Sequence, residues 1–292
     1  MSSPLALSCV VLPDSPPAEF VARVRDVEQA RARTAWTYDH LSWGELREGP
    51  WFATVPLIAA AAAATGTVRL GTQVATPNFR HPIPFAQEVM TLDHLSRGRL
   101  DLGVGAGARD SDSRVLGQTE LTMRERADRF EEWAILLLEA LAGGVTDHAG
   151  PYYVAVDART LPGCFQTPHV PLTVAATGPR GMRIAAEHAD AWVTYGPYDR
   201  SLPPDEWLTE VGRQNERFSA VLDETAPHRA VRRIAQVAAS EQRPFVDPGA
   251  YAQLVQGLAD AGFDEVSVHW PRADGRGVPA KRLDDVVAVH LG

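Results

Sequence analysis

The fold is decided by the stretch Val68–Gly107, which reads VRLGTQVATPNFRHPIPFAQEVMTLDHLSRGRLDLGVGAG. Its first residues, 68–74, form a short β-branched run, and residues 75–81 contain the Pro, Asn and Arg of a loop. Pro82 is suited to a first helical turn, because the N–H that it lacks has no partner at that position of a helix. Apolar residues then recur at mostly helical spacing as far as Leu95. The stretch therefore predicts a strand, a loop and a helix in succession.

A second strand completes this unit. Gly98 ends the predicted helix, and residues 99–104 are again mostly apolar. A helix of this length between two strands is a crossover connection, which implies that the strands are parallel. Ligands meet the carboxyl ends of the strands in such sheets. We therefore expect a binding site at residues 72–81 and 105–113.

The same alternation continues along the rest of the chain. Further strands are predicted at residues 5–12, 35–38, 171–176, 191–195, 230–239 and 265–270. Further helices are predicted at residues 18–33, 52–65, 121–141, 182–188, 206–223, 248–261 and 280–291. Eight strands alternating with eight helices predict an α/β protein, a (β/α)8 TIM barrel that occupies residues 1–292 as one domain.

Two segments depart from a plain barrel. Residues 143–170 show no clear periodicity, and we interpret them as an insertion after the fourth helix or as a lid. The helix at residues 52–65 is rich in Ala and apolar on nearly every face. Such a helix has to be covered on both sides, either within the fold or by another subunit. If another subunit covers this helix, the protein is expected to be a homodimer.

Composition narrows the class of protein. Hydrophobic residues make up 45% and charged residues 22% of the chain, as in ordinary globular proteins. The net charge is −9 and Lys281 is the only lysine, which argues against a nucleic-acid partner. Cys9 and Cys164 are too few for a disulfide framework. With no signal peptide and no segment long enough to span a membrane, a cytoplasmic protein is expected.

The first site candidates follow the second predicted strand. Asp39 and His40 are polar residues at the end of an otherwise buried strand, where such residues usually have a partner or a function. His40 is the best candidate for a general acid or base, because its ordinary pKa is nearest to physiological pH. Asp39 would orient His40 or hydrogen-bond a cofactor ring. A purely structural Asp–His pair is the alternative.

A second candidate site follows the fifth strand. Thr177, Gly178, Pro179 and Arg180 lie where a helix begins, so that free N–H groups would face a phosphate near the positive end of the helix dipole. An ordinary strand-to-helix turn is the alternative.

The glycines at residues 103–107 almost match a dinucleotide-binding fingerprint. They follow the fourth strand rather than the first, and a polar loop follows them instead of a helix, which argues against a Rossmann fold. Gly105 and Gly107 would instead let a flat ligand approach the backbone. The histidines His81, His94, His188 and His269 show no metal-ligand spacing, so no metal site is predicted.

Several motifs together carry a family resemblance. The opening stretch, with WTYDHL at residues 36–41, VAATGPRGMRIAAEHADAW at residues 174–192 and AGFDEVSVHW at residues 261–270, resembles the bacterial luciferase-like superfamily of flavin and deazaflavin oxidoreductases. The resemblance implies a (β/α)8 barrel with the cofactor ring over the carboxyl ends of the strands.

The resemblance also assigns parts of the cofactor site. The ring would rest on a bulge of the third strand at Thr72, Gln73 and Val74, with a non-prolyl cis peptide near Gln73-Val74. The cofactor phosphate would lie against residues 178–180. The pair Asp39-His40 resembles that of the branch that uses coenzyme F420, where the Asp helps to hold the deazaflavin and the His serves acid–base chemistry. Coenzyme F420 is therefore preferred over FMN.

This chain departs from the sugar-phosphate dehydrogenases of that branch in two ways. Those enzymes carry an acidic residue where this chain has Ala108, and Asp110 or Asp112 would have to replace it. They also bind the substrate phosphate with lysines, whereas Lys281 is the only lysine here. Both departures argue against a sugar-phosphate substrate.

Three functions remain open at this point. The first is hydride transfer between coenzyme F420 and a small organic substrate. The second is an FMN-dependent monooxygenase supplied by a separate flavin reductase, and the third is a non-catalytic flavin-binding barrel. The predicted substrate pocket is mostly aromatic and consists of Trp43, Trp51, Phe79, His81 and Tyr195.

Overall fold

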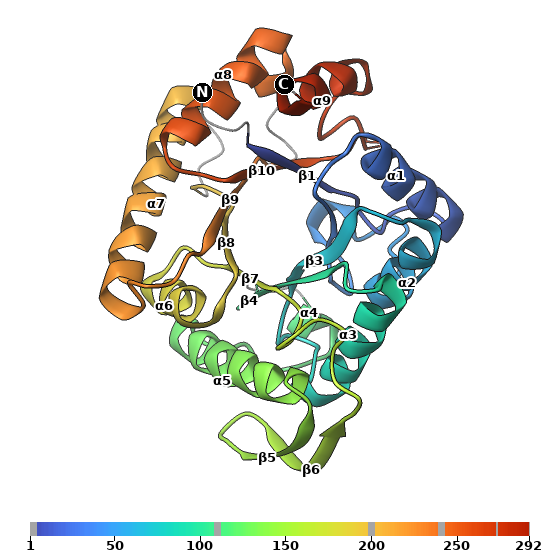
Figure 1. The fold of residues 1–292 in the computed structure, drawn as a ribbon, viewed down its shortest axis with the longest axis vertical. Helices are drawn as coiled ribbons and strands as arrows, with labels where there is room; N and C mark the ends of the chain where they lie inside the picture. Colours follow the sequence, from blue (N-terminus) through green and yellow to red (C-terminus); the bar gives the residue numbers. More distant parts are fainter. Residues whose placement is uncertain (1–4, 108–111, 198–201, 239–242, 273, 292) are drawn as a thin grey trace.

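The computed structural model describes residues 5–107, 112–197, 202–238, 243–272 and 274–291. Eight parallel strands close into a barrel in the order β1-β10-β9-β8-β7-β4-β3-β2, which surrounds the centre of Figure 1. The barrel strands are β1 (Ala6–Val10), β2 (Thr34–Thr37), β3 (Arg69–Ala75), β4 (Leu100–Gly105), β7 (Leu172–Ala175), β8 (Ala191–Thr194), β9 (Arg232–Gln236) and β10 (Glu265–His269). The predicted (β/α)8 fold is confirmed.

Helices form the outer ring around these strands (Figure 1). They are α1 (Pro17–Gln29), α2 (Thr54–Ala64), α3 (Pro82–Ser96), α4 (Asp112–Val115), α5 (Met123–Leu141), α6 (Pro179–His188), α7 (Pro204–Thr225), α8 (Pro248–Asp260) and α9 (Leu283–Leu291). Short 3-10 turns lie at η1 (Gly44–Leu46), η2 (Arg243–Phe245) and η3 (Ala280–Arg282). Proline occupies the first turn of several of these helices, including α3 and α6. The polar loop predicted after the glycines at residues 103–107 contains the short helix α4, which the prediction missed.

The insertion is a regular element rather than the aperiodic segment predicted. Within it, β5 (Gly144–Ala149) and β6 (Val154–Thr160) pair as an antiparallel hairpin. The hairpin packs on α3 and α5 and projects beyond the ring of helices, away from the barrel centre (Figure 1). The hairpin is not part of the closed barrel, and its role as an insertion or a lid stays a prediction.

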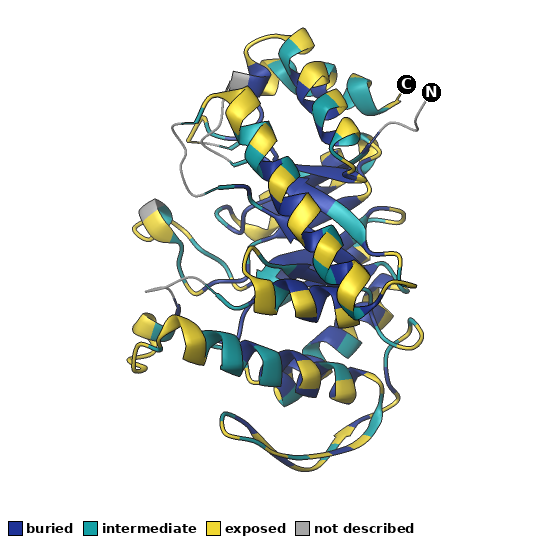
Figure 2. Cartoon of the chain, turned by 90° about the vertical axis from the view of Figure 1, so that its left-hand side faces the viewer, coloured by how far each residue is buried: buried dark blue, intermediate teal, exposed yellow. Residues whose placement is uncertain are grey.

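The apolar core has two layers. The larger layer lies between the strands and the helices, and Figure 2 shows the buried strands inside helices whose outer faces are exposed. A smaller cluster fills the inside of the barrel and includes Val10, Trp36, Val193 and Ile234, each fully buried. Since side chains fill its centre, ligands have access only from the ends of the barrel.

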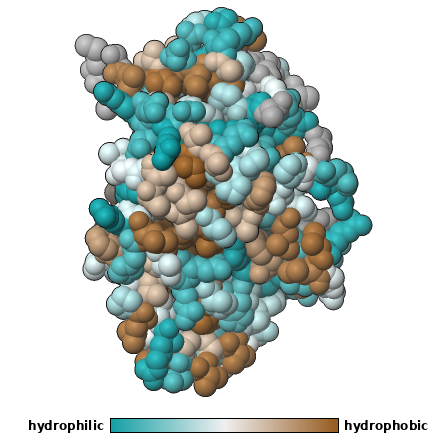
Figure 3. Space-filling view, turned by 90° about the vertical axis from the view of Figure 1, so that its right-hand side faces the viewer, coloured by the Kyte–Doolittle hydropathy of each residue, from teal (hydrophilic) through white to brown (hydrophobic). Residues whose placement is uncertain are grey.

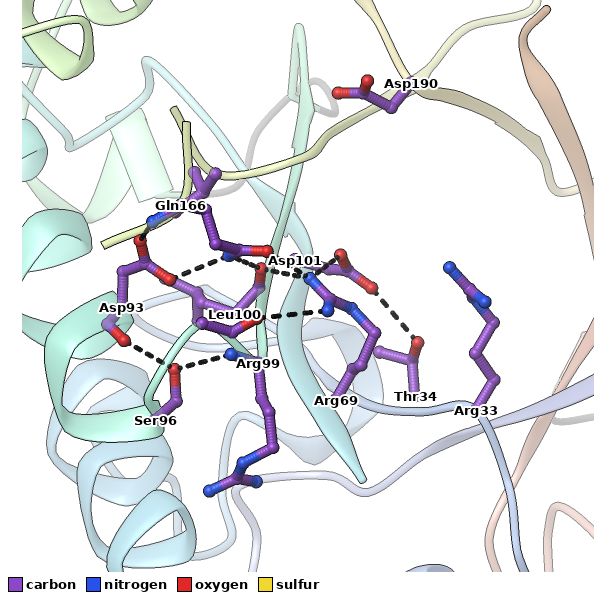
Figure 4. A network of polar contacts seen from close by, with 12 residues as sticks. Arg33, Thr34, Arg69, Asp93, Ser96, Arg99, Leu100, Asp101, Gln166 and Asp190 are labelled. Carbon is purple, nitrogen blue, oxygen red and sulfur yellow. Dashed lines mark hydrogen bonds and ion pairs between the residues drawn. The ribbon is translucent and has the colours of Figure 1, made fainter. Parts of the chain in front are cut away.

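A polar network closes the amino ends of the strands (Figure 4). Asp101 at the start of β4 pairs with Arg69 at 2.7 Å and accepts a hydrogen bond from Thr34. The side chain of Gln166, which belongs to the insertion, donates to Asp93 and to the carbonyl of Leu100, each at 2.8 Å. The insertion is thus fastened to the end of the barrel that serves stability in this fold.

The Ala-rich helix α2 is covered on one side only. Leu57, Ile58 and Ala61 are buried, whereas Pro56 and Ala60 are exposed on the outer face. Figure 3 views the side of the molecule on which α1, α2 and α3 lie, where apolar patches alternate with hydrophilic ones. Among the helices that the structure describes, none combines the length and apolar character that crossing a bilayer requires.

Candidate active site

A buried histidine–carboxylate pair lies at the carboxyl end of β2. His40 follows this strand by three residues and is 9% exposed, and Asp112, the first residue of α4, is fully buried. The Nδ1 atom of His40 is 2.8 Å from Oδ2 of Asp112. The other oxygen, Oδ1, accepts a hydrogen bond from the backbone N–H of Leu41 at 2.7 Å. The loop after β2 and the start of α4 are thereby joined by one carboxylate.

Asp39 has a different partner. Its two oxygens accept hydrogen bonds from the Arg80 guanidinium at 3.0 and 2.7 Å, and Arg80 also pairs with Glu88 at 2.8 Å. Burial opposes the charge of Arg80, but the hydrogen bond to Asp39 and the charges of Asp39, Glu88 and Asp112 raise its pKa above the ordinary value. Of the two carboxylates, Asp112 and not Asp39 therefore orients His40.

Aromatic side chains enclose His40. The Trp43 ring stacks on the imidazole with 4.4 Å between ring centroids, and Tyr38 meets the imidazole edge-on at 6.1 Å. Trp51 donates from its indole N–H to the backbone carbonyl of His40 at 2.7 Å. The structure thus brings together His40, Trp43 and Trp51 of the predicted site, and adds Tyr38, which the sequence analysis did not single out.

The other predicted pocket residues lie in separate loops at the same end of the barrel. Phe79 lies under the Arg80 guanidinium at 4.7 Å. His81 precedes α3, where its Nδ1 accepts from the N–H of Ile83, and burial lowers its pKa. Tyr195 directly follows β8. Contact of these three side chains with a substrate stays a prediction.

The third strand has an irregularity where the resemblance implied one. The register between β3 and β4 shifts between Thr72 and Ala75, and the peptide Gln73-Val74 is cis. Thr72 donates from its hydroxyl to the carbonyl of Gly103 at 2.7 Å. Gln73 accepts from Ser267 through Oε1, while its buried Nε2 has no hydrogen-bond partner among the described residues. The bulge of β3 thus carries a hydrogen-bond donor without a partner among the described residues.

Protein packing already accounts for the glycines Gly105, which ends β4, and Gly107, which follows it. A Cβ at Gly107, whose φ is +80°, would lie 2.4 Å from Nδ2 of Asn78. A Cβ at Gly105 would lie 3.0 Å from Cγ2 of Val74. Contact of either glycine with a flat ligand stays a prediction.

The start of α6 matches the predicted anion site in its backbone but not in its arginine. Gly178 is the N-cap without a side-chain hydrogen bond, Pro179 follows, and residues 177–180 are exposed. The first N–H groups of the helix are therefore open to a ligand. Arg180 instead binds Asp128 and Glu131 on α5, and these hydrogen bonds raise its pKa.

A further polar group lies next to Tyr38. His269, at the end of β10, has its Nε2 3.1 Å from the Tyr38 hydroxyl and 3.2 Å from Nε2 of Gln236. Burial lowers the pKa of His269 to about 3, so the ring is neutral at physiological pH. In the sequence, only its place at the end of a strand marked this residue. Within the described ranges, no three His, Cys, Asp or Glu side chains come together as a metal site.

These features define the class of protein. It is a (β/α)8-barrel protein with a histidine–carboxylate pair and an open helix start at the carboxyl ends of its strands. The chain belongs to the luciferase-like monooxygenase family, whose model matches residues 3–243.

Two individual proteins of known name are similar to this chain over most of its length. The chain is 37% identical over 214 residues to an F420-dependent glucose-6-phosphate dehydrogenase of Beutenbergia cavernae, a match that covers 71% of this chain but only 62% of that enzyme. It is 27% identical over 299 residues to an F420-dependent hydroxymycolic acid dehydrogenase of Mycobacterium tuberculosis, covering 87% of this chain and 79% of the relative.

A solved structure agrees with the fold. The coenzyme F420 dependent tetrahydromethanopterin reductase of Methanopyrus kandleri superimposes with a TM-score of 0.76 over 98% of both chains, at 17% identity.

Proposed function

We propose that this chain is an oxidoreductase that uses coenzyme F420 to transfer hydride to or from a small organic substrate. The observation that carries the proposal is His40, held by Asp112 and stacked on Trp43 at the carboxyl end of the barrel. Relatives whose names state F420 dependence support the choice of cofactor.

The residues present fit a ring-and-phosphate cofactor. Pro179 has no N–H, so the free backbone N–H groups of Gly178 and of the first helical residues after Pro179 would hold the phosphate, with Thr177 beside them. The bulge at residues 72–74 would support the ring, and the unpartnered Nε2 of Gln73 is a donor for one of its polar atoms. When bound, coenzyme F420 supplies a carbon that accepts or gives a hydride.

The protein's own contribution is orientation and proton transfer. His40 would give a proton to the substrate oxygen or take one from it as the hydride moves, a role worth about 100- to 10,000-fold in rate. Asp39 would act through Arg80, to which it is bound, and not through His40. Trp43, Trp51 and Phe79 favour an apolar or ring-containing substrate. The single lysine, Lys281, argues against a sugar phosphate.

A binding titration tests this proposal. Fluorescence quenching should show that F420 binds tighter than FMN, and turnover should follow with a suitable alcohol or carbonyl compound. His40→Ala should bind F420 as the wild type does and lose turnover. Failure to bind F420 would contradict the proposal, whereas binding without turnover of any substrate would favour a non-catalytic barrel.

An FMN-dependent monooxygenase is the second candidate, favoured by the family's own description as monooxygenases. It would need a separate flavin reductase as partner and a dry pocket around the reduced flavin. Oxygen-dependent product formation with reduced FMN would support it. Failure to bind FMN would exclude it.

We also propose that the protein is a cytoplasmic homodimer in which α2 packs on a second subunit. The exposed Pro56 and Ala60 lie on the outer face of α2, a helix without a single charged residue. Cys9 and Cys164 are both free, which suits a reducing compartment. Light scattering should report a dimer, and Ala60→Arg should yield a folded monomer. A wild-type monomer would contradict the α2 interface.

A further inference from the structure

The carboxylate beside His40 comes from a distant part of the chain. Asp112 lies 72 positions after His40, yet its Oδ2 is 2.8 Å from the imidazole Nδ1. Its Oδ1 is taken by the N–H of Leu41, so both oxygens serve the segment that carries His40. Asp39, the direct neighbour of His40 in sequence, has both oxygens on Arg80.

The hydrogen bond decides which imidazole nitrogen carries the proton. An ionised carboxylate only accepts hydrogen bonds, so the Nδ1 atom of His40 has to be the donor. In a neutral ring, the Nε2 atom then has a free lone pair. Within the described ranges, no hydrogen bond to another residue engages that atom. Nε2 is therefore available to a substrate.

Neighbouring residues hold both the imidazole ring of His40 and the backbone beside it in place. Trp43 stacks on the imidazole at an angle of 28° between the planes, and the Trp51 indole holds the carbonyl of His40 at 2.7 Å. The N–H of Leu41 is held by Asp112 itself. Rotation of the ring by 180° would put a C–H group where the Nδ1–H now meets Asp112, and the loss of that hydrogen bond to a buried carboxylate is unfavourable.

We propose that Asp112 is a positioning residue for proton transfer: it fixes the Nδ1–H form of His40 and makes Nε2 the atom that exchanges a proton with the substrate. The inference rests on the proposed function for its substrate and cofactor. With an alcohol, the O–H bond would break and its proton would go to Nε2, while the C–H electron pair would leave with its hydrogen as the hydride that bound F420 would accept. The alcohol becomes a carbonyl compound, and Asp112 stabilises the imidazolium.

The Asp112→Asn variant is a sharp test because it keeps the shape of the side chain. The N–H of Leu41 still needs an acceptor, so the amide oxygen stays there and the amide NH₂ faces His40. That group donates to Nδ1, which forces the proton of the neutral ring to Nε2. The variant should therefore invert the tautomer.

Histidine ¹⁵N NMR of the cofactor-free protein reads the tautomer directly. The His40 signal is identified as the one that is missing in His40→Gln. The wild type should show Nδ1–H and Asp112→Asn should show Nε2–H. An Nε2–H signal in the wild type, or an unchanged Nδ1–H signal in Asp112→Asn, would overturn the proposal whether or not F420 binds.

Kinetics on the holoenzyme complete the test. Asp112→Asn should lower kcat by about 100- to 10,000-fold with little change in KM or F420 affinity, as expected when a general base has the wrong tautomer. Asp93→Asn is the matched control, because Asp93 is fully buried and uses both oxygens, but bonds Gln166 in the amino-end network. Equal losses of kcat in both variants would assign Asp112 a merely structural role.

Discussion

At the scale of single residues, the charged side chains of the candidate site are largely buried, and each binds more than one partner. Asp112 binds His40 and Leu41, and Arg80 joins Asp39 to Glu88. Truncation of such a group leaves its partner unpaired in a poorly solvated place, which costs more than the lost bond itself. The functional and structural roles of these side chains are therefore separable only by variants that keep their shape.

Glu28, which is partly exposed, also accepts several hydrogen bonds. These hydrogen bonds predict that the stability of the protein depends on pH. Its Oε1 accepts from the N–H groups of Gly66, Thr67 and Val68 in the turn before β3. Burial alone would raise the pKa of Glu28, but the hydrogen bonds from Thr67, Val68 and Gly66 lower it to about 2.

The depressed pKa sets the direction of the effect. The stabilisation is fully present above the ordinary pKa of 4.5 and is lost as the pH falls towards 2. Glu28→Gln should lower the free energy of unfolding at pH 7 by about 1 kcal/mol, a value reduced by partial solvent exposure. Urea unfolding at pH 7 and pH 3 measures it: the gap between wild type and variant should narrow at pH 3, and a constant gap would contradict this account.

At the scale of elements, the start of α6 allows a test in which stability and binding move in opposite directions. Gly178 is an N-cap with open space at its Cβ position. Gly178→Asp should cap the helix and stabilise it by a few tenths of a kcal/mol. The added carboxylate should also repel a bound phosphate and weaken F420 binding by about tenfold.

Gly178→Ser is the matched control, since it supplies the cap without the charge. It should bind F420 more tightly than Gly178→Asp does in the same fluorescence titration. Wild-type affinity in Gly178→Asp would show that the cofactor phosphate lies elsewhere.

The close approach of β3 and β4 gives a second prediction for elements. A Cβ at Gly103 would lie 2.0 Å from the carbonyl oxygen of Thr72, a backbone atom that cannot move alone. Gly103→Ala should therefore destabilise the barrel by about 3 kcal/mol. In Gly105→Ala the nearest atom is a side-chain methyl of Val74 at 3.0 Å, and a loss of about 1 kcal/mol is expected. Thermal unfolding compares the two, and equal losses would contradict the steric explanation.

The sequence predicted best those features whose pattern lies within one short stretch of the chain. The periodicity of residues 83–95 and the glycine at residue 98 predicted α3 and its end, and the motif around His40 pointed to the candidate site. Asp112 was considered only as a replacement for an acidic residue, because nothing local links it to a histidine 72 positions away. The hairpin β5–β6 was missed because its strands are short and half-exposed, with Val145 and Val156 on the outside. Ala108 and Asp110 lie outside the described residues.

At the scale of the whole molecule, the barrel separates its two ends. The candidate active site lies at the carboxyl ends of the strands, whereas Arg69, Asp101 and Gln166 form the polar network at the amino ends. That network ties the insertion to β3, β4 and α3 (Figure 4). Stability can therefore be altered there without touching the site.

Gln166→Ala tests this separation. The variant loses the hydrogen bonds of its amide group with Asp93, Arg69 and the carbonyl of Leu100. The free energy of unfolding should fall by about 2–3 kcal/mol, with kcat unchanged below the melting temperature. Gln256→Ala is the control, since that side chain makes one exposed bond to Asp260 and should change stability by less than about 0.5 kcal/mol. A loss of kcat in Gln166→Ala would contradict the separation.

The polar network at the amino ends has a consequence for the history of the protein. In the substrate pocket that we propose, replacements around Trp43, Trp51 and Phe79 should alter which compound is accepted, while the network at the opposite end keeps the barrel closed. Substitutions that change the substrate can therefore accumulate during evolution on the same barrel, because they do not remove the contacts at the amino ends that stabilise it.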